Sequence, residues 1–224
     1  MKVRGRIDRT TRRHITGLYD HRLQRLYVRA KLAGDPVYAA AIAIVADSAL
    51  PMLDIGCGIS LLGQCLNARG HTQPYLGLDH DKRKIDTGRR AAQQAGLDAV
   101  MHLQHVDAAE LPAMQGNVAV LDVLHYLSAD RQIALLQAAS LRLAPQGCLI
   151  IRNVLREPNW RYLATRVEEF FLHASGWLPD RAQHYPSADE LLVPLEDAGL
   201  EVSIKPLRGR SPYNSYLIVA RRHG

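Results

Sequence analysis

The stretch Met52-Leu53-Asp54-Ile55-Gly56-Cys57-Gly58-Ile59-Ser60 is the segment around which we expect this chain to fold. It runs from apolar residues into an acid and then into two glycines separated by one residue, and a helical pattern follows. Glycine at these two positions permits a sharp turn and leaves bare main chain for a ligand to approach. The following helix would direct free N–H groups and the positive end of its dipole at that ligand. The stretch therefore predicts a strand, a ligand-binding turn and a helix.

Acidic residues end the next two strand-like segments. Gly77-Leu78-Asp79 ends about 20 residues after the glycines, where a carboxylate can accept hydrogen bonds from two ribose hydroxyls. Val106-Asp107-Ala108 ends the segment after that. A dinucleotide fingerprint would need a third glycine at position 61, where Leu61 stands. The pattern therefore favours a nucleoside ligand and argues against NAD or FAD.

The order of these motifs resembles the class I S-adenosylmethionine-dependent methyltransferases. The likeness rests on Leu53 to Gly58, on Asp79 and Asp107, and on two later stretches, Val120-Leu121-Asp122-Val123-Leu124-His125 and Leu143-Ala144-Pro145-Gln146-Gly147-Cys148-Leu149-Ile150-Ile151. It covers residues 40–155 and is similar to bacterial members of secondary-metabolism, quinone or pigment pathways. The alternative is an unrelated α/β domain with glycine turns.

The resemblance implies an α/β, Rossmann-like fold: a mostly parallel seven-stranded sheet with helices on both faces and an added helical lid. Alternating patterns predict strands near 51–55, 74–79, 99–106, 117–122 and 147–153. The helices are expected at 60–69, 82–95, 129–143, capped by Ser128 or Asp130, and 187–198. Residues 201–206 and 213–220 resemble the family's closing antiparallel pair. Parallel strands joined by helices carry their ligand sites at the carboxyl ends of the strands.

We expect two parts, a basic arm with a helix over residues 1–35 and a methyltransferase domain over 36–224. Residues 1–31 carry ten basic and two acidic side chains, a net +8, so the remainder of the +6 total is about −2. Such an arm can attract nucleic acid, an acidic lipid surface or an acidic carrier protein, or it is simply a solvated face. The negative body makes a nucleic-acid enzyme the less favoured reading. Residues 1–13 are expected to be an exposed end that folding does not need. Helices are expected over 18–32 and from Pro36, capped by Asp35, to Ala46.

Composition indicates one soluble domain with a sizeable core. The apolar run from Val37 to Ala46 is too short to span a membrane, and no signal-peptide pattern opens the chain. The three cysteines are too few for a disulfide framework or a zinc site, so no metal is expected and a reducing cytoplasm fits best. A monomer or a homodimer is equally compatible with the sequence.

Residues 158–186 are predicted to form the lid. Apolar side chains recur at helical spacing from Trp160 to Leu178, and both tryptophans lie there. This face is either ordinary core or a lid that closes over an apolar or aromatic acceptor.

The resemblance also implies a set of cofactor residues. Asp54 would orient the amino group of S-adenosylmethionine, Gly56 and Gly58 would admit its backbone, Asp79 would bind the ribose, and Asp107 with the Ala108 N–H would meet the adenine. The alternative for the three acids is helix capping or loop solvation. Tyr19 and Arg22 are added because the segment before the first strand often packs over the cofactor. The predicted cofactor site comprises Tyr19, Asp54, Gly56, Cys57, Gly58, Asp79, His80, Asp107, Ala108 and Asp122.

The acceptor is a small molecule by elimination. Asp122-Val123-Leu124-His125 is not the (Asp/Asn)-Pro-Pro-(Tyr/Phe) clamp for base amines, no Pro-Cys pair is present, and Glu168-Glu169 lies on the lid rather than after the fourth strand. A hydroxyl or carboxyl oxygen is the simplest methyl acceptor. His125 is the candidate general base, with His184 and Tyr185 as rivals, although a carboxylate acceptor would need no base. An RNA or protein methyltransferase and a non-catalytic cofactor-binding protein stay open.

Overall fold

The core of the fold is a set of short strands, most of whose side chains are buried. These strands are β1 (Met52–Ile55), β2 (Tyr75–Asp79), β3 (Met101–His105), β4 (Asn117–Leu121) and β5 (Cys148–Val154). Every residue of β1 and of β5 is buried, as expected for parallel strands covered by helices on both sides. The structure is a computed structural model that describes residues 6–107, 111–157, 162, 182–207 and 214–222.

The seven strands form one sheet in the order β3-β2-β1-β4-β5-β7-β6. The pairs among β1 to β5 are parallel, whereas β7 (Ser215–Arg222) runs antiparallel to both β5 and β6 (Leu200–Pro206). The expected mostly parallel, seven-stranded sheet with a closing antiparallel pair is therefore confirmed. The strand order reverses between β1 and β4, which is the point where ligands bind in folds of this class.

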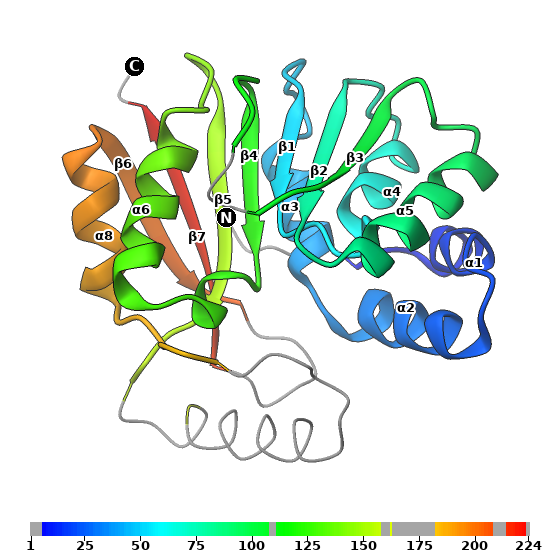
Figure 1. The fold of residues 1–224 in the computed structure, drawn as a ribbon, viewed down its shortest axis with the longest axis horizontal. Coiled ribbons are helices and arrows are strands. Elements are labelled where there is room, and N and C mark those ends of the chain that lie inside the picture. Colours follow the sequence, from blue (N-terminus) through cyan, green and yellow to red (C-terminus); the bar gives the residue numbers. More distant parts are fainter. Residues whose placement is uncertain (1–5, 108–110, 158–161, 163–181, 208–213, 223–224) are drawn as a thin grey trace.

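Helices cover both faces of the sheet (Figure 1). One hydrophobic cluster joins the sheet to α1 (Arg9–Gly17), α2 (Arg22–Gly34), α3 (Val37–Ile44), α4 (Leu61–Asn67) and α5 (Lys82–Gln94). The other cluster joins the opposite face to α6 (Ala129–Ser140) and α8 (Ala188–Asp197). A short 3-10 turn, η1 (Leu124–Tyr126), follows β4 at the lower edge of the sheet in Figure 1. The expected Rossmann-like architecture is confirmed.

Local capping explains where several helices begin. Ser187 and Glu190 form a reciprocal capping box at the start of α8, in agreement with the helix expected over 187–198. Pro36, rather than the expected Asp35, is the N-cap residue of α3, but Asp35 Oδ1 accepts the N–H of the first helical residue, Val37, at 3.0 Å. Ser128 occupies the N-cap position of α6, but its side chain makes no capping hydrogen bond there.

The N-terminal segment differs from the expectation. Instead of an exposed end before a single helix over 18–32, the chain forms two helices, α1 and α2. Asp8 caps α1 by accepting the Thr11 N–H at 2.9 Å, and Ile7 and Ile15 are 2% and 0% exposed in the main core. The expected exposed end is therefore wrong at Ile7, which is buried, whereas the prediction that folding does not need residues 1–13 stays a prediction.

The lid expected over 158–186 lies mostly outside the described residues, which include only 162 and 182–186 of that range. Both tryptophans lie outside them as well. Within the part of the chain that the structure describes, no helix is long and apolar enough to cross a membrane.

Candidate active site

The glycine turn after β1 lies against the end of β2. Gly56 and Gly58 both have positive φ angles, 76° and 56°, a region that glycine enters without steric cost. A Cβ at Gly56 would meet Val123 Cγ2 at 2.2 Å, whereas a Cβ at Gly58 would meet no atom of the described chain within 4 Å. Gly56 is therefore needed for packing, and Gly58 leaves open space beside the main chain.

Asp79 fixes this turn from the neighbouring strand. Its Oδ2 accepts the Gly58 N–H at 2.8 Å, and its Oδ1 accepts the Asp81 N–H at 2.8 Å. The carboxylate is only 5% exposed, yet each oxygen keeps a second lone pair for a ligand hydroxyl. The predicted ribose residue thus also has the structural role that we considered as its alternative.

Tyr19 reaches the same turn from the segment between α1 and α2. Its hydroxyl donates to the Ile59 carbonyl at 2.9 Å, and its own carbonyl accepts Arg25 Nε at 2.6 Å. The ring is 1% exposed, and burial raises the pKa of its hydroxyl. Tyr19 therefore supports the turn from outside, while Arg22 lies exposed at the start of α2.

Asp54 is the least satisfied carboxylate near the turn. It is 2% exposed, and Tyr75 donates its hydroxyl to Oδ2 at 2.5 Å, while Oδ1 has no hydrogen-bond partner among the described residues. Burial raises the pKa of Asp54 to about 7, against the smaller lowering effect of the Tyr75 hydrogen bond. A buried oxygen without a donor is costly, so this atom suits a ligand that brings an amino group or a water.

The remaining predicted cofactor residues lie closer to solvent. The side chains of Asp107 and His80 are 56% and 64% exposed; Asp107 pairs with Arg131 at 3.2 Å, and the His80 carbonyl accepts from His105 Nε2 at 2.9 Å. The Cys57 thiol is buried against Gly58, which raises its pKa. Ala108 lies outside the described residues.

Asp122 belongs to a compact cluster of four charges. Lys31 Nζ lies 3.2 Å from Asp122 and 2.9 Å from Asp35, and Arg152 pairs with Asp122 and lies 3.7 Å from Asp35. The Asp122 backbone is left-handed, with a φ of 62°. Burial opposes ionisation of Asp122, but Arg152 and Lys31 outweigh it and hold its pKa well below the usual range. This predicted cofactor residue therefore already has two cationic partners.

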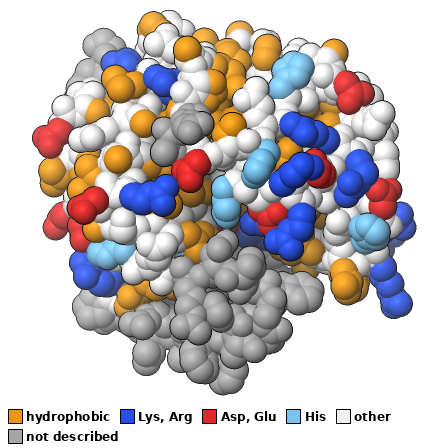
Figure 2. Space-filling model, in the orientation of Figure 1, with side chains coloured by type: hydrophobic (Ala, Val, Ile, Leu, Met, Phe, Trp, Pro, Cys, Tyr) orange, Lys and Arg blue, Asp and Glu red, His pale blue; other side chains and the backbone are white. Residues whose placement is uncertain are grey.

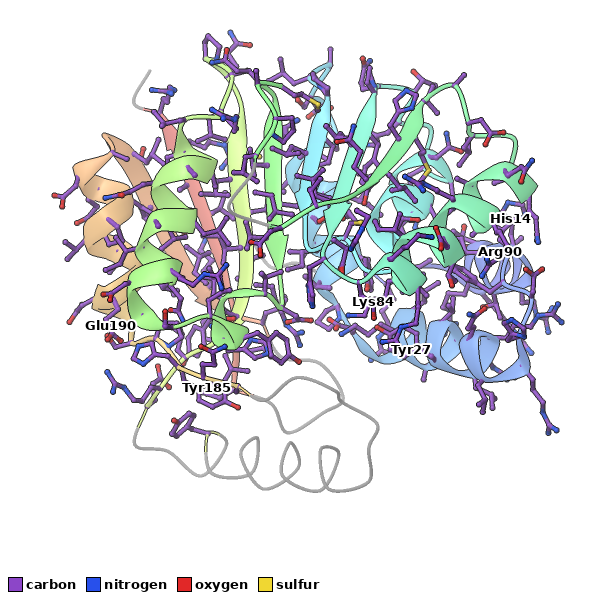
Figure 3. All side chains as sticks on the ribbon, in the orientation of Figure 1. His14, Tyr27, Lys84, Arg90, Tyr185 and Glu190 are labelled. Atoms are coloured by element: carbon purple, nitrogen blue, oxygen red, sulfur yellow. The ribbon has the colours of Figure 1, made fainter. Side chains whose placement is uncertain are left out.

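The three candidate catalytic residues lie together beyond β4. The rings of His125 and Tyr185 stack with centroids 6.0 Å apart and an interplanar angle of 2°. The His184 N–H donates to the His125 carbonyl at 3.3 Å, while the His184 ring contacts Glu190 at 3.2 Å. Figure 3 places Tyr185 just beyond the lower edge of the sheet, with Glu190 beside it at the start of α8. His125 is 4% exposed, and burial lowers the pKa of its imidazole.

Several residues that contact the candidate site residues were missed by the sequence reasoning. They are Lys31, Tyr75, Arg152, Asn153 and Tyr162, the last of which contacts Tyr185 edge-on at 5.5 Å. One signal was available: Arg152 and Asn153 interrupt an apolar strand, and polar side chains in a buried strand need partners. Lys31 and Tyr162 carried no such signal.

Two other features were considered as ligand sites. A hollow of about 20 Å³ lies among the strand starts Met52, Tyr75 and Met101, at the far end of the sheet, and it has room for about one water. Among the described residues, no group of three His, Cys, Asp or Glu side chains could hold a metal ion.

Comparison with known proteins agrees with this geometry. A sequence profile described as a methyltransferase domain matches residues 52–147. The ubiquinone biosynthesis O-methyltransferase of Rickettsia canadensis is 26% identical over 72% of this chain and 66% of its own length. The corresponding protein of Rickettsia conorii is 24% identical over 87% of this chain and 74% of its own length. The chain thus spans about two thirds to three quarters of these relatives.

Solved structures share the fold. The magnesium protoporphyrin IX methyltransferase of Synechocystis, with bound S-adenosylhomocysteine, superposes with a TM-score of 0.68 at 20% identity, covering 96% of this chain and 93% of its own. A [4+2]-cyclase superposes with a TM-score of 0.60 at 16% identity, covering 82% and 80%, so the fold alone does not fix the reaction. The ordered motifs, the strand order and the profile match over residues 52–147 together show a methyltransferase domain with the fold of the S-adenosylmethionine-dependent methyltransferases.

Proposed function

We propose that this protein transfers the methyl group of S-adenosylmethionine to an oxygen atom of a small aromatic or apolar acceptor. The observation that carries the proposal is the position of His125, a buried imidazole of lowered pKa that stacks on Tyr185 just after β4. The relatives named as ubiquinone O-methyltransferases support an oxygen acceptor.

The residues around the glycine turn fit the cofactor of this family. The unpartnered Asp54 Oδ1 matches an ammonium group, and the open space at Gly58 admits a ligand against bare main chain. Asp79, with His80 beside it, would hold the ribose, and Asp107 with Ala108 would hold the adenine. Tyr19 would stabilise the glycine turn through its hydrogen bond to the Ile59 carbonyl. Asp122 would fix the chain after β4 through its ion pairs with Lys31 and Arg152. When bound, S-adenosylmethionine supplies a methyl group on a positively charged sulfur.

The chain's own contribution would be to position the acceptor and remove its proton. A phenol or alcohol oxygen becomes a better nucleophile as its proton leaves, and a neutral imidazole can accept that proton. His125 is predominantly neutral near pH 7, because burial lowers its pKa from 6.5. His184 is the weaker rival, since its ring nitrogen already contacts Glu190. Tyr185 would order the His125 ring by stacking.

The experiment is a comparison of three variants with a panel of phenols, alcohols and carboxylates and isotopically labelled cofactor. His125→Gln should lower turnover with a phenol about 10²–10⁴-fold, while His184→Gln and Tyr185→Phe change it much less. Calorimetry should give the same cofactor affinity for all four proteins. Equal turnover in all of them would exclude general-base catalysis by His125. Cofactor binding without turnover on any acceptor would favour the non-catalytic alternative, and methylation of RNA or protein would favour the macromolecular one.

A second proposal concerns the partner of α2, an anionic membrane surface that presents an apolar acceptor. Leu23, Leu26 and Tyr27 are 66%, 54% and 42% exposed, and their spacing places them on one side of α2. Arg22 and Arg29 are exposed on the same helix. In Figure 2, Lys and Arg side chains gather on the right half of the molecule, where Figure 1 places α1, α2 and α5. An apolar stripe flanked by arginines suits the boundary between lipid headgroups and chains.

Vesicle sedimentation tests this partner. The protein should bind vesicles that contain phosphatidylglycerol and ignore pure phosphatidylcholine, and Leu23→Ser/Leu26→Ser should weaken binding at least tenfold. The matched control is Ile133→Ser/Leu141→Ser on and beside α6, where two apolar side chains are exposed to similar extents, 41% and 65%. Equal binding of both double variants would contradict the proposal. Binding to an acidic protein or to heparin, but not to vesicles, would identify a carrier or nucleic acid instead.

We also propose a cytoplasmic location for this protein. The three free, buried cysteines are consistent with it.

A further inference from the structure

Asn153, on β5, is a fully buried polar residue that touches the candidate base. It is 0% exposed, and its Oδ1 lies 2.9 Å from His125 Nδ1. An asparagine inside an all-buried strand loses its water and must be compensated by hydrogen bonds. The buried hydrogen bond between Asn153 and His125 therefore helps to compensate the lost hydration of the Asn153 amide.

The amide of Asn153 can face the imidazole in one orientation only. Its Nδ2 donates to the Val154 carbonyl at 3.0 Å. A flipped amide would turn Oδ1 toward that carbonyl and place two acceptors against each other. The oxygen therefore faces His125, and because an amide oxygen only accepts, Nδ1 of the ring must carry the proton. In a neutral imidazole with its proton on Nδ1, the lone pair is on Nε2.

Other contacts hold the plane of the ring but do not select its tautomer. Tyr185 stacks on one side, and Tyr126 lies 4.1 Å away at 44°. The His125 carbonyl accepts the Gln183 and His184 N–H groups at 2.8 and 3.3 Å. Within the part of the chain that the structure describes, Nε2 makes no hydrogen bond, so Asn153 alone distinguishes the two nitrogens.

Burial is the main reason that the His125 ring stays neutral. Burial has the largest effect and lowers the pKa of His125, the Asn153 hydrogen bond and Asp122 raise it, and Arg152 and Lys31 lower it again. A ring that stays neutral near pH 7 exists as one of two tautomers, so the group that selects the tautomer also decides which nitrogen can accept a proton.

We propose that Asn153 is a positioning residue that holds His125 with its proton on Nδ1 and thereby makes Nε2 the nitrogen that accepts the acceptor's proton. The catalytic meaning of this inference rests on the proposed function, but the tautomer itself does not. Asn153 touches neither substrate nor cofactor in the proposal and acts through His125.

The tautomer can be measured without any reaction. Nitrogen NMR of the full chain labelled with ¹⁵N-histidine separates protonated from unprotonated ring nitrogens, and the His125→Gln spectrum identifies the signals of His125. At pH 8 we expect a protonated Nδ1 and an unprotonated Nε2 in the unaltered protein. A protonated Nε2 would overturn the proposal, whatever the activity of the enzyme.

Three variants then separate positioning from a merely structural role. Asn153→Ala removes the hydrogen bond that raises the pKa of His125, so the ring should populate both tautomers and the midpoint of the pH–rate profile should move down. Asn153→Asp keeps an acceptor oxygen but adds a negative charge, so Nδ1 should stay protonated and the midpoint should move up. Turnover at the alkaline plateau should fall about tenfold in the alanine variant and recover in the aspartate variant.

Asn117→Ala is the matched control. Asn117 is likewise a buried asparagine in a strand, 2% exposed, and its Oδ1 accepts the Cys148 N–H at 3.2 Å, but it stands at the start of β4, away from the site. This variant should lose comparable stability without any change in tautomer or midpoint. If all variants have the same midpoint of the pH–rate profile, Asn153 has a structural role only. Full turnover of His125→Gln, with the tautomer result intact, would instead reject the general base and leave the positioning contact standing.

Discussion

Two carboxylates at the carboxyl edge of the sheet have opposite surroundings. Asp54, near the end of β1, is 2% exposed; within the described part of the chain, the Tyr75 hydroxyl donates to its Oδ2 and no group donates to its Oδ1. Asp122, just after β4, is 27% exposed in its side chain and is paired with both Lys31 and Arg152. The pKa of Asp54 is raised to about 7 by burial, whereas the two cations hold the pKa of Asp122 well below its usual range.

We propose that the difference separates a ligand-binding carboxylate, Asp54, from a structural one, Asp122. An unsatisfied buried carboxylate destabilises the unliganded protein and gains the most from a cationic ligand. A carboxylate that already has two cations gains little from another ligand and instead joins elements together, here α2 to β4 and β5. On this proposal the two halves of the edge have different functions. The β1–β2 half, with Asp54, is prepared for a ligand. The β4–β5 half, with Asp122 and Arg152, is locked by ion pairs.

The largest effect is expected from breaking the locked half. Arg152→Met should destabilise the protein by about 3 kcal/mol, because it leaves two carboxylates around one lysine in a mostly buried cluster. Since Asp122 has a lowered pKa, its contribution is present above the ordinary value of 3.8 and is lost as the pH falls below it. The variant should therefore differ most from the unaltered protein near neutral pH and less in acid, as measured by urea unfolding between pH 3 and 7.

The control for this prediction is Arg131→Met. Arg131 also pairs with an aspartate, Asp107, but both side chains are 56% exposed. Its loss should cost less than about 0.5 kcal/mol, because solvent screens such a pair. Equal destabilisation by the two substitutions would show that the cluster is no more than a surface ion pair.

The same division explains how much the sequence could predict. Gly58 and Asp79 are 21 positions apart within one strand–helix–strand unit, so their contact follows from the motif and the topology. Lys31 and Asp122 are 91 positions apart. His125 and Asn153 are 28 positions apart within the β4–α6–β5 unit, but their contact depends on the η1 turn, which brings His125 against β5. Such contacts depend on how α2 and β5 pack against the edge, which periodicity does not specify. The fold and the glycine turn were therefore predictable, whereas the locked cluster and the partner of His125 were not.

The second effect concerns the prepared half. Gly58→Val should weaken cofactor binding at least 100-fold, about 2.7 kcal/mol, because the side chain would fill space that no described atom occupies. Its left-handed φ of 56° adds a backbone strain of about 1–2 kcal/mol. Gly96→Val carries the same strain, with a φ of 68° and nothing within 4 Å, but lies after α5. Calorimetry should therefore show lost cofactor binding in the first variant only; parallel losses in both would mean that strain, not the ligand space, is responsible.

The smallest effect tests Asp54 itself, and its sign runs against the usual result of altering a binding residue. As pH rises from 3.8 toward about 7, the unfolded chain releases the Asp54 proton while the folded chain keeps it. The folded state then binds more protons, so the stability of the unliganded protein falls across this range. Asp54→Asn can still accept the Tyr75 hydrogen bond but carries no charge. It should therefore be about 2 kcal/mol more stable than the unaltered protein at pH 8, with a flatter pH dependence.

The same substitution should weaken cofactor binding about tenfold, because the ligand amino group loses its carboxylate partner. Tyr75→Phe provides the opposite test, since it removes the hydroxyl that donates to Asp54 Oδ2 and should lower stability at pH 8. Thermal unfolding of the three unliganded proteins at pH 5 and pH 8, followed by calorimetry with the cofactor, measures both effects. A variant Asp54→Asn that is less stable at pH 8 and keeps the original pH dependence would show that Asp54 is satisfied in the unliganded protein. The contrast between an unsatisfied Asp54 and a paired Asp122 would then be wrong. A more stable variant that binds the cofactor poorly would establish that this edge gives up stability at Asp54 in order to bind its ligand.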